Sequence, residues 1–347
     1  MFTVDSCTGK FNATTPATIA TGYALPQSGA EQMVVDPRGR FAYVANLVSN
    51  ASDLSTISMY TINPSTGVLI PTTPATVPTG WFPQGIAIDP LGRFVYTANT
   101  DDSSISMFTI NQTTGVLTPT APASVSTLIP GEALSDPGFL TVDPTGKFLY
   151  VSASDSVDAT VSMYTINQTT GVLTPTSPAT VLTAGIPFQV VVAPSGKFAY
   201  VVNNFAGPGN PNAVSQYTVD SVTGVLTESS SNEVAAGNGP TAIAVDPTSK
   251  FAYVVNRLDD TVSMFTIDPN TGNLTLNSTA TNPTATIATG TEPFRIDFDP
   301  SGKFVYVTNE GSAASIYTVN SDGTLTNTGV TGVATGALST AITALSK

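Results

Sequence analysis

The sequence predicts an all-β fold, a seven-bladed β-propeller made of four-stranded antiparallel blades. A string of the form Asp-Pro-x-Gly-Lys/Arg-Phe recurs six times at spacings of 50 to 54 residues, and a segment similar to Tyr-Val-x-Asn follows each copy. The chain also lacks helical periodicity of useful length. A four-stranded unit of this size that repeats radially is typical of a β-propeller. The six copies begin at Asp36, Asp89, Asp143, Ala193, Asp246 and Asp299.

Each repeat is predicted to contain four short strands, a to d. In the second repeat, strand a covers residues 85–89, strand b 94–99 and strand c 105–110, and strand d begins near Val116. These runs are rich in β-branched and aromatic residues and are bounded by Gly, Pro, Asn and Asp. The Asp-Pro-x-Gly string is a turn between strands a and b, because Pro fixes φ, Asp accepts backbone hydrogen bonds and Gly tolerates a positive φ.

The two ends of the chain are predicted to share the seventh blade. Residues 1–5 align with residues 107–111, so the chain begins in a strand c, and its last residues supply a strand a. We therefore expect a single propeller domain over residues 1–347 in which blade seven lacks strand b. The predicted segments are 1–29 (strands c and d of blade seven), 30–83 (blade one), 84–137 (blade two), 138–186 (blade three), 187–239 (blade four), 240–292 (blade five), 293–336 (blade six) and 337–347 (strand a of blade seven).

The missing strand would leave two sheet edges with unpaired N–H and C=O groups. Three interpretations remain open. A segment before Met1 supplies the strand, a second copy or a partner protein inserts one by β-augmentation, or blade seven has three strands. The second interpretation predicts self-association, and a head-to-tail contact of this kind produces filaments unless it closes.

The composition excludes several classes of function. The 347 residues include 11 Lys and Arg, 24 Asp and Glu, one Cys and no His, which gives a net charge of −13. Without His there is no imidazole base and no ordinary zinc site, and Cys7 alone cannot form an internal disulfide. The negative charge argues against a nucleic-acid partner. Because the apolar runs are strand-sized, no helix is expected to span a membrane. We expect no metal or other cofactor.

The Tyr-Val-x-Asn strands, the Asp-Pro-x-Gly-Lys-Phe turns before them and the repeat period resemble the YVTN-repeat propellers. More specifically, they resemble the lactonase-type, 6-phosphogluconolactonase-like seven-bladed propellers. The resemblance extends over essentially the whole chain and implies the fold. Members of this group range from sugar-lactone hydrolases to cell-envelope proteins without catalysis. For the enzymes, the resemblance implies a His with Glu and Arg groups around the central channel. This chain has no His, so that catalytic set cannot be carried over.

Two charged residues stand out on the strands expected to line the channel. Arg295 and Asp297 lie two positions apart, and therefore on one face of strand a, where the other copies carry mostly small or uncharged residues. They indicate either a site for an anionic or polar ligand or, more simply, a local ion pair. Glu31 and Gln189 complete the set of candidate ligand-binding residues. Strand a is expected to start at one rim of the channel. Further charges expected around that rim are Arg257, Asp259, Asp260 and Glu310.

Two other patterns concern the loops. The acidic pairs that precede strand c lack the alternating oxygen spacing of a calcium loop, so we interpret them as solvated charges. These pairs are Asp101 with Asp102, Asp155 with Asp158, and Asp259 with Asp260. Six Asn-x-Ser/Thr sequons are candidates for glycosylation, and with the Lys-poor, hydroxyl-rich composition they favour an extracellular or cell-surface location. They are Asn12, Asn50, Asn111, Asn167, Asn273 and Asn277.

Three hypotheses for function follow. The residues favour a non-catalytic extracellular or cell-surface structural or interaction protein, self-assembling through the incomplete blade. The alternative implied by the resemblance is a lactonase-like hydrolase that uses Arg and carboxylate groups at the central channel. The third is a binding module of a larger surface protein. The sequence itself assigns no catalytic residue.

Overall fold

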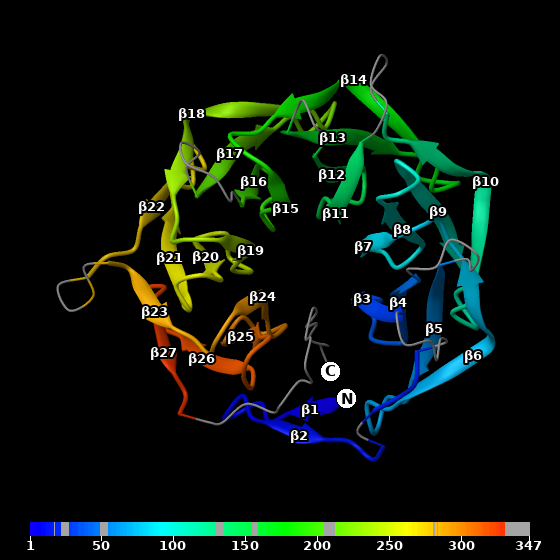
Figure 1. Cartoon of the computed structure of the whole chain (residues 1–347), viewed down its shortest axis with the longest axis horizontal. Helices are drawn as coiled ribbons and strands as arrows, with labels where there is room; N and C mark the ends of the chain where they lie inside the picture. Colours follow the sequence, from blue (N-terminus) through cyan, green and yellow to red (C-terminus); the bar gives the residue numbers. More distant parts are fainter. Residues whose placement is uncertain are drawn as a thin grey trace. The chain divides into compact units, whose positions relative to one another are not determined.

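The computed structural model describes residues 1–16, 18–21, 28–48, 55–128, 135–154, 159–204, 212–279, 282 and 284–329. These residues form β-strands joined by turns, and no helix occurs among them. The strands make six antiparallel blades and a separate two-stranded sheet (Figure 1). Contacts divide the chain into two compact units. Unit 1 contains the described residues among 1–3 and 12–180, and unit 2 contains those among 4–11 and 181–344.

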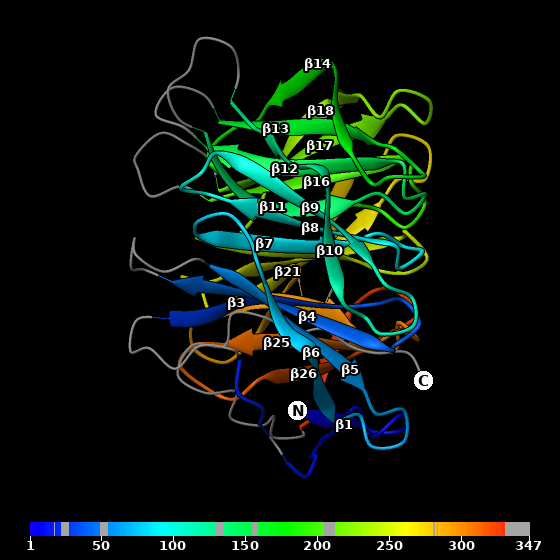
Figure 2. The ribbon, with the colours of Figure 1, turned by 90° about the vertical axis from the view of Figure 1, so that its right-hand side faces the viewer.

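Blades one to three each pair four strands in chain order, as predicted. Blade one comprises β3 (Ser28–Val35), β4 (Phe41–Val48), β5 (Thr56–Ile62) and β6 (Leu69–Pro78). Blade two comprises β7 (Pro83–Ile88), β8 (Phe94–Asn99), β9 (Ser104–Ile110) and β10 (Leu117–Ser126). Blade three comprises β11 (Asp136–Val142), β12 (Phe148–Ser154), β13 (Ala159–Ile166) and β14 (Leu173–Leu182). Figure 2 shows β7 to β10 running side by side.

Blades four and six follow the same pattern, whereas blade five departs from it. Blade four comprises β15 (Pro187–Val192), β16 (Phe198–Asn203), β17 (Ala213–Val219) and β18 (Leu226–Ala235). Blade six comprises β24 (Pro293–Phe298), β25 (Phe304–Asn309), β26 (Ser315–Val319) and β27 (Leu325–Asn327). Blade five comprises β19 (Pro240–Val245), β20 (Phe251–Asn256), β21 (Thr261–Ile267), β22 (Leu274–Leu276) and β23 (Thr286–Ala288). Both β22 and β23 pair with β21, so the predicted single strand d is split. Between them, backbone hydrogen bonds link Thr279 and Asn282.

The predicted strands c and d at the start of the chain are present as β1 (Phe2–Val4) and β2 (Phe11–Ala13), which pair with each other. Within unit 2, the Phe11 ring lies 4.8 Å from the Tyr306 ring, centroid to centroid. Lys303 Nζ lies 3.4 Å from the carbonyl oxygen of Cys7. The strand a predicted in residues 337–347 lies outside the described residues. The structure therefore establishes six blades, five with four strands and one with a split outer strand, and the shared seventh blade stays a prediction.

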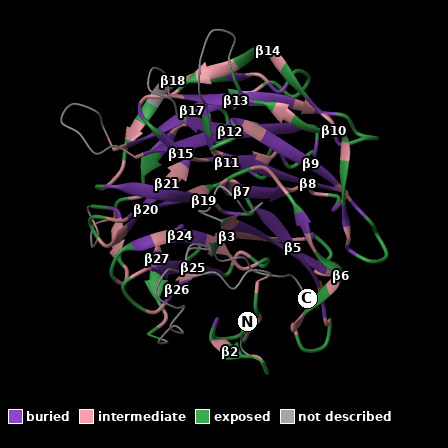
Figure 3. Ribbon diagram, turned by 45° about the vertical axis from the view of Figure 1, so that its right-hand side comes forward, coloured by how far each residue is buried: buried purple, intermediate pink, exposed green. Residues whose placement is uncertain are grey.

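Strand b is the most deeply buried strand of a blade. Every residue of β8 is buried, and the same holds for β16 and β25. The outer strand β10 is mostly exposed and carries Pro119 and Pro122, residues that suit a sheet edge because they do not offer an N–H to another strand. Figure 3 shows this gradient, with buried inner ribbons and exposed outer ones. A blade buries its faces only against neighbouring blades, so contacts between blades stabilise the fold.

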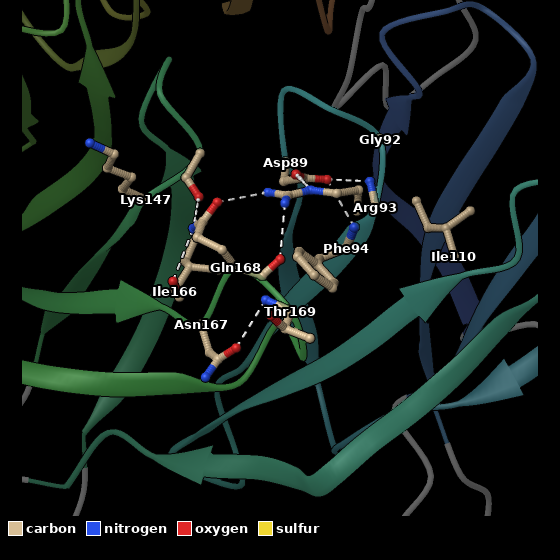
Figure 4. Close-up of polar contacts among 12 residues, drawn as sticks. Asp89, Gly92, Arg93, Phe94, Ile110, Lys147, Ile166, Asn167, Gln168 and Thr169 are labelled. Carbon is tan, nitrogen blue, oxygen red and sulfur yellow. Dashed lines mark hydrogen bonds and ion pairs between the residues drawn. The ribbon is translucent and has the colours of Figure 1, made fainter.

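The repeated Asp acts in the turn between strands a and b, as the sequence predicted. Asp89 Oδ1 accepts hydrogen bonds from the backbone N–H groups of Arg93 and Phe94. Its Oδ2 forms a 2.8 Å ion pair with Arg93 Nε. The Arg93 guanidinium also donates to the carbonyl and the side-chain oxygens of Gln168 in the next blade, at 3.0 and 3.1 Å (Figure 4). The turn therefore caps its own blade and fastens it to the following one.

In four blades the Tyr of the Tyr-Val-x-Asn-like segment makes a second contact between blades. Tyr96 Oη donates to the carbonyl oxygen of Gly171 at 2.9 Å, in the turn between strands c and d of the next blade. The bond recurs in both units, as Tyr43 to Gly115, Tyr200 to Gly272 and Tyr253 to Gly323. In blade six, the buried hydroxyl of Tyr306 has no hydrogen-bond partner among the described residues.

This difference predicts unequal effects of one substitution. Tyr96→Phe should lower the free energy of unfolding by about 1–3 kcal/mol, because it leaves the buried carbonyl of Gly171 without its donor. Tyr306→Phe should change it by less than about 0.5 kcal/mol, because it removes a hydroxyl that bonds to nothing described. Urea denaturation of both variants measures the two values. Equal losses of unfolding free energy in the two variants would contradict the hydrogen bond assigned to Tyr96 and its absence at Tyr306.

The buried tyrosines also predict alkaline unfolding. Burial raises the pKa of Tyr164 and of Tyr317 to about 12, above the ordinary value of 10.0, and it raises the pKa of Tyr96 further. A raised folded-state pKa contributes stability that is fully present below the unfolded pKa and is lost as the pH rises through the folded value. The free energy of unfolding should therefore fall steeply between about pH 10 and 12. Urea titrations across this range, followed by circular dichroism, test it; a flat profile would contradict it.

Candidate functional site

The start of strand a and the loop after strand b lie at the same end of a blade. The backbone N–H of Glu310, after β25, donates to the carbonyl of Glu292, before β24, at 2.9 Å. The N–H of Arg257, after β20, donates to the carbonyl of Gly239, before β19, at 2.9 Å. We call this end of unit 2 the rim. It contains the charges that were predicted there from the sequence.

A register shift near the start of strand a inserts one extra residue in all six blades. In β24 the pairing passes from Pro293 opposite Asn309 to Arg295 opposite Thr308, so Phe294 is the extra residue. The same shift makes Phe188 the extra residue of β15 and Thr241 that of β19. Bulges redirect side chains and are frequent next to functional sites. The adjacent strands β15, β19 and β24 thus present two aromatic rings and a hydroxyl at the rim.

Arg295 is buried beneath the rim, with a fractional exposure of 6%. Its guanidinium carbon lies 4.7 Å from the centroid of the Phe294 ring and 5.3 Å from that of Phe188. Its Nη1 donates to the carbonyl oxygen of Thr241 at 3.4 Å. The two rings pack edge to face at 5.7 Å and 89°. Arg295 therefore holds the aromatic pair in place through cation–π contacts and a link to β19.

The other candidates from strand a have separate surroundings. Asp297 Oδ1 accepts from the backbone N–H of Phe298 at 2.8 Å. Gln189 Oε1 accepts from the backbone N–H of Ile243 at 2.9 Å, which ties β15 to β19. Glu31 is the extra residue in the bulge of β3 and belongs to unit 1. The structure thus gives Gln189 a clear role in joining blades, and it places Arg295 rather than Asp297 against the aromatic pair.

An ion cluster lies beside one ring of this aromatic pair, that of Phe294. Arg257 Nη2 lies 2.5 Å from Glu310 Oε2 and 3.6 Å from Glu292 Oε2. The Arg257 guanidinium is also 5.6 Å from the Phe294 ring centroid. The Glu310 side chain is only 11% exposed, whereas those of Arg257 and Glu292 are 37% and 55% exposed. A nearly buried carboxylate, a half-exposed guanidinium and apolar rings therefore lie together at one place.

The repeat explains how Arg257 and Glu310 meet. Each occupies the position directly after a Tyr-Val-x-Asn-like segment, in consecutive blades, so the fold places them side by side. The equivalent residues of the preceding blades are uncharged: Leu47, Thr100, Ser154 and Asn204. Comparison of these positions could have predicted the pair. The aromatic rings and Glu292 were missed, although the residues in the bulges vary as strongly between copies.

Described carboxylates in the acidic loops before strand c accept hydrogen bonds from the backbone. Asp259 Oδ2 accepts from the N–H of Asn238 at 2.7 Å, and Asp260 Oδ1 from that of Glu292 at 2.8 Å. Asp102 Oδ2 accepts from the N–H of Trp81 at 2.6 Å. Asp155 and Asp158 lie outside the described residues. No group of three or more His, Cys, Asp or Glu side chains within the described ranges is arranged to hold a metal ion. Nor does the described part of the chain contain a helix long and apolar enough to cross a membrane.

The sequons have different environments. Asn12, Asn111 and Asn167 are exposed, and the last two cap the turn between strands c and d. Asn273 is partly buried, and Asn277 Nδ2 donates to the carbonyl of Asp322 at 2.9 Å. Asn50 lies outside the described residues. Glycosylation of the exposed three stays a prediction.

Comparison with known proteins identifies relatives. A family model described as "Lactonase, 7-bladed beta-propeller" matches residues 1–127, 122–208 and 211–336. The 6-phosphogluconolactonase of Bacillus subtilis is 32% identical over 105 residues, which cover 30% of this chain and 30% of that protein. The 6-phosphogluconolactonase of Serratia proteamaculans is 36% identical over 90 residues, which cover 26% and 27%. The matched segments thus span less than a third of each curated relative.

Solved structures share the fold. A putative 6-phosphogluconolactonase from Bacteroides uniformis matches with a TM-score of 0.75 at 22% identity, covering 95% of this chain and 91% of that one. The periplasmic gluconolactonase of Pseudomonas aeruginosa matches with a TM-score of 0.72 at 20% identity, covering 93% and 89%.

The curated relatives overturn the expectation of a non-catalytic structural protein, because those that match are enzymes named 6-phosphogluconolactonase. That expectation depended on the absence of catalytic groups such as His, on the hydroxyl-rich surface and on the incomplete blade. The absence of imidazole removes one class of base. Carboxylate groups can still transfer protons, and guanidinium groups can still stabilise negative charge.

Proposed function

We propose, because the chain belongs to the lactonase family of seven-bladed β-propellers, that it hydrolyses a lactone at the rim of unit 2. The observation that carries this proposal is the pair of Arg257 and Glu310 beside the Phe294 ring, which in turn packs against Phe188. The names of the relatives supply the reaction class, and the residues of this chain supply the groups that perform it.

Glu310 is the proposed general base. Its Oε2 is held by Arg257, and a carboxylate has enough lone pairs for Oε1 to accept a hydrogen bond from a water molecule. Glu310 takes a proton from that water as its oxygen attacks the lactone carbonyl carbon. When the tetrahedral intermediate collapses, the ring C–O bond breaks and the proton passes to the ring oxygen. The product is a hydroxy acid, which releases one proton to solvent at neutral pH.

Arg257 is the proposed electrophile. A guanidinium remains charged throughout the accessible pH range, so it can stabilise the oxyanion that forms on the carbonyl oxygen. Its partial exposure lets it contact a substrate while it keeps Glu310 in place. The partly buried rings of Phe188 and Phe294 form an apolar surface beside the pair, and Arg295 positions them from below.

An activity assay tests this function. The purified chain is mixed with five- and six-membered lactones in weak buffer near pH 7, and acid release is followed with a pH indicator against the spontaneous rate. We expect saturable acceleration for at least one lactone. No acceleration above the spontaneous rate with any ring size would contradict the proposal.

A further inference from the structure

We propose that this site, taken as the lactonase site proposed above, accepts an uncharged lactone and rejects lactones that carry a phosphate or carboxylate. The inference depends on the proposed function and concerns which substrates the same residues admit.

Charge is distributed unevenly between the two ends of the blades. Among the described Lys and Arg residues of unit 2, only Arg257 and Arg295 lie at the rim end. The others lie in the turns at the opposite end, between strands a and b or between strands c and d. These are Lys10, Lys197, Lys250 and Lys303. Four carboxylates lie in the loops of the rim end: Asp259, Asp260, Glu292 and Glu310. The rim of unit 2 is therefore net negative.

The equivalent end of the blades in unit 1 is also net negative. Its described residues include Glu31, Asp101, Asp102 and Asp136 and no Lys or Arg, because the basic residues of this unit lie in the turns between strands a and b. Those turns contain Arg38, Arg40, Arg93 and Lys147. Considered separately, each unit thus presents an acidic rim.

Neither rim arginine is placed to bind a permanent anion such as a phosphate or a carboxylate. Arg295 is buried, with its guanidinium between aromatic rings and the carbonyl of Thr241. Arg257 is paired with two carboxylates, so its charge is more than balanced locally. A phosphate near Arg257 would also lie near Glu310 and Glu292, and repulsion between like charges at such distances is substantial in a partly desolvated site.

Glu292 occupies a position that favours glycine. Its φ is +51°, in the left-handed region, and the equivalent residue of blade five is Gly239, with a φ of +62°. A side chain in this conformation costs conformational energy that Gly avoids. The rim thus has an acidic side chain, 3.6 Å from Arg257, at a position where blade five has a glycine and therefore no side chain.

The test compares two probes that differ by one phosphate, glucono-δ-lactone and its 6-phosphate. We expect kcat/KM to be at least about tenfold higher for the uncharged lactone. One repulsive contact in a partly solvated site is enough to lower kcat/KM for the phosphate ester by that factor. Added salt should raise the rate with the phosphate ester and leave that with the uncharged lactone nearly unchanged, because screening weakens repulsion.

A variant pair assigns the effect to the rim. Glu292→Gln should raise kcat/KM for the phosphate ester relative to the uncharged lactone. Glu228→Gln, which changes an exposed carboxylate on the outer strand β18, should leave that ratio unchanged. A preference for the phosphate ester, or inhibition of its hydrolysis by salt, would overturn this inference and leave the proposed function standing. Hydrolysis of neither probe, with no other lactone accepted, would overturn both.

Discussion

Replacing Glu310 with Gln should reduce kcat/KM for lactone hydrolysis by about 10²- to 10⁴-fold, the usual contribution of a general base. Gln has the same shape and can still accept the hydrogen bond from Arg257, so the contact between blades five and six should persist. The loss should appear in kcat rather than in KM, because the base acts in the chemical step. Initial rates at several lactone concentrations measure both constants.

Matched variants separate catalysis from structure. Arg257→Met should also reduce kcat by about 10²- to 10³-fold, the usual effect of removing an oxyanion donor. Glu228→Gln, in the same unit but on an outer strand, should leave both constants unchanged. If Glu310→Gln lowers the free energy of unfolding while the folded protein keeps its full kcat, the pair is only a structural contact between blades.

The second large effect concerns the contact between blades. Gly171→Ala should lower the free energy of unfolding by about 2–5 kcal/mol, from two separate causes. The φ of Gly171 is +75°, where a side chain costs about 1–2 kcal/mol. An added Cβ would also meet the Phe94 ring, and overpacking of this kind costs about 1–3 kcal/mol.

Gly196→Ala is the matched control. Its φ is +69°, but an added Cβ there meets no atom within 4 Å. It should therefore lose only the conformational part, about 1–2 kcal/mol. The difference between the two variants, measured by urea denaturation, isolates the packing of the turn of blade three against blade two. Equal losses would mean that this packing contributes little.

Much of the fold could be predicted because the same strand and turn pattern occurs six times in the sequence. Residues 94–99 and the Asp-Pro-x-Gly turns were predicted residue by residue, and the structure confirms both. The split outer strand of blade five was missed because the repeat pattern weakens after Leu276 and nothing in the sequence shows that Thr286–Ala288 returns to β21.

The candidate site could be predicted only in part. Arg295 was recognised as a charge among mostly uncharged residues, whereas Arg257 and Glu310 were expected around the same rim only as solvated loop charges. Their partners were not, because Phe188 and Phe294 enter the site through bulges, and a bulge breaks the alternation from which the direction of a side chain is read. Gln189 was selected for its polarity, yet its side chain joins two strands.

The most direct test of the account is a crystal structure of the protein with an uncharged δ-lactam, which has the ring and carbonyl of the proposed substrate but resists hydrolysis. The account predicts that the lactam carbonyl oxygen lies about 2.7–3.2 Å from the Arg257 guanidinium, with the ring against Phe188 or Phe294. A lactam that inhibits hydrolysis but binds away from Arg257 and Glu310 would contradict it.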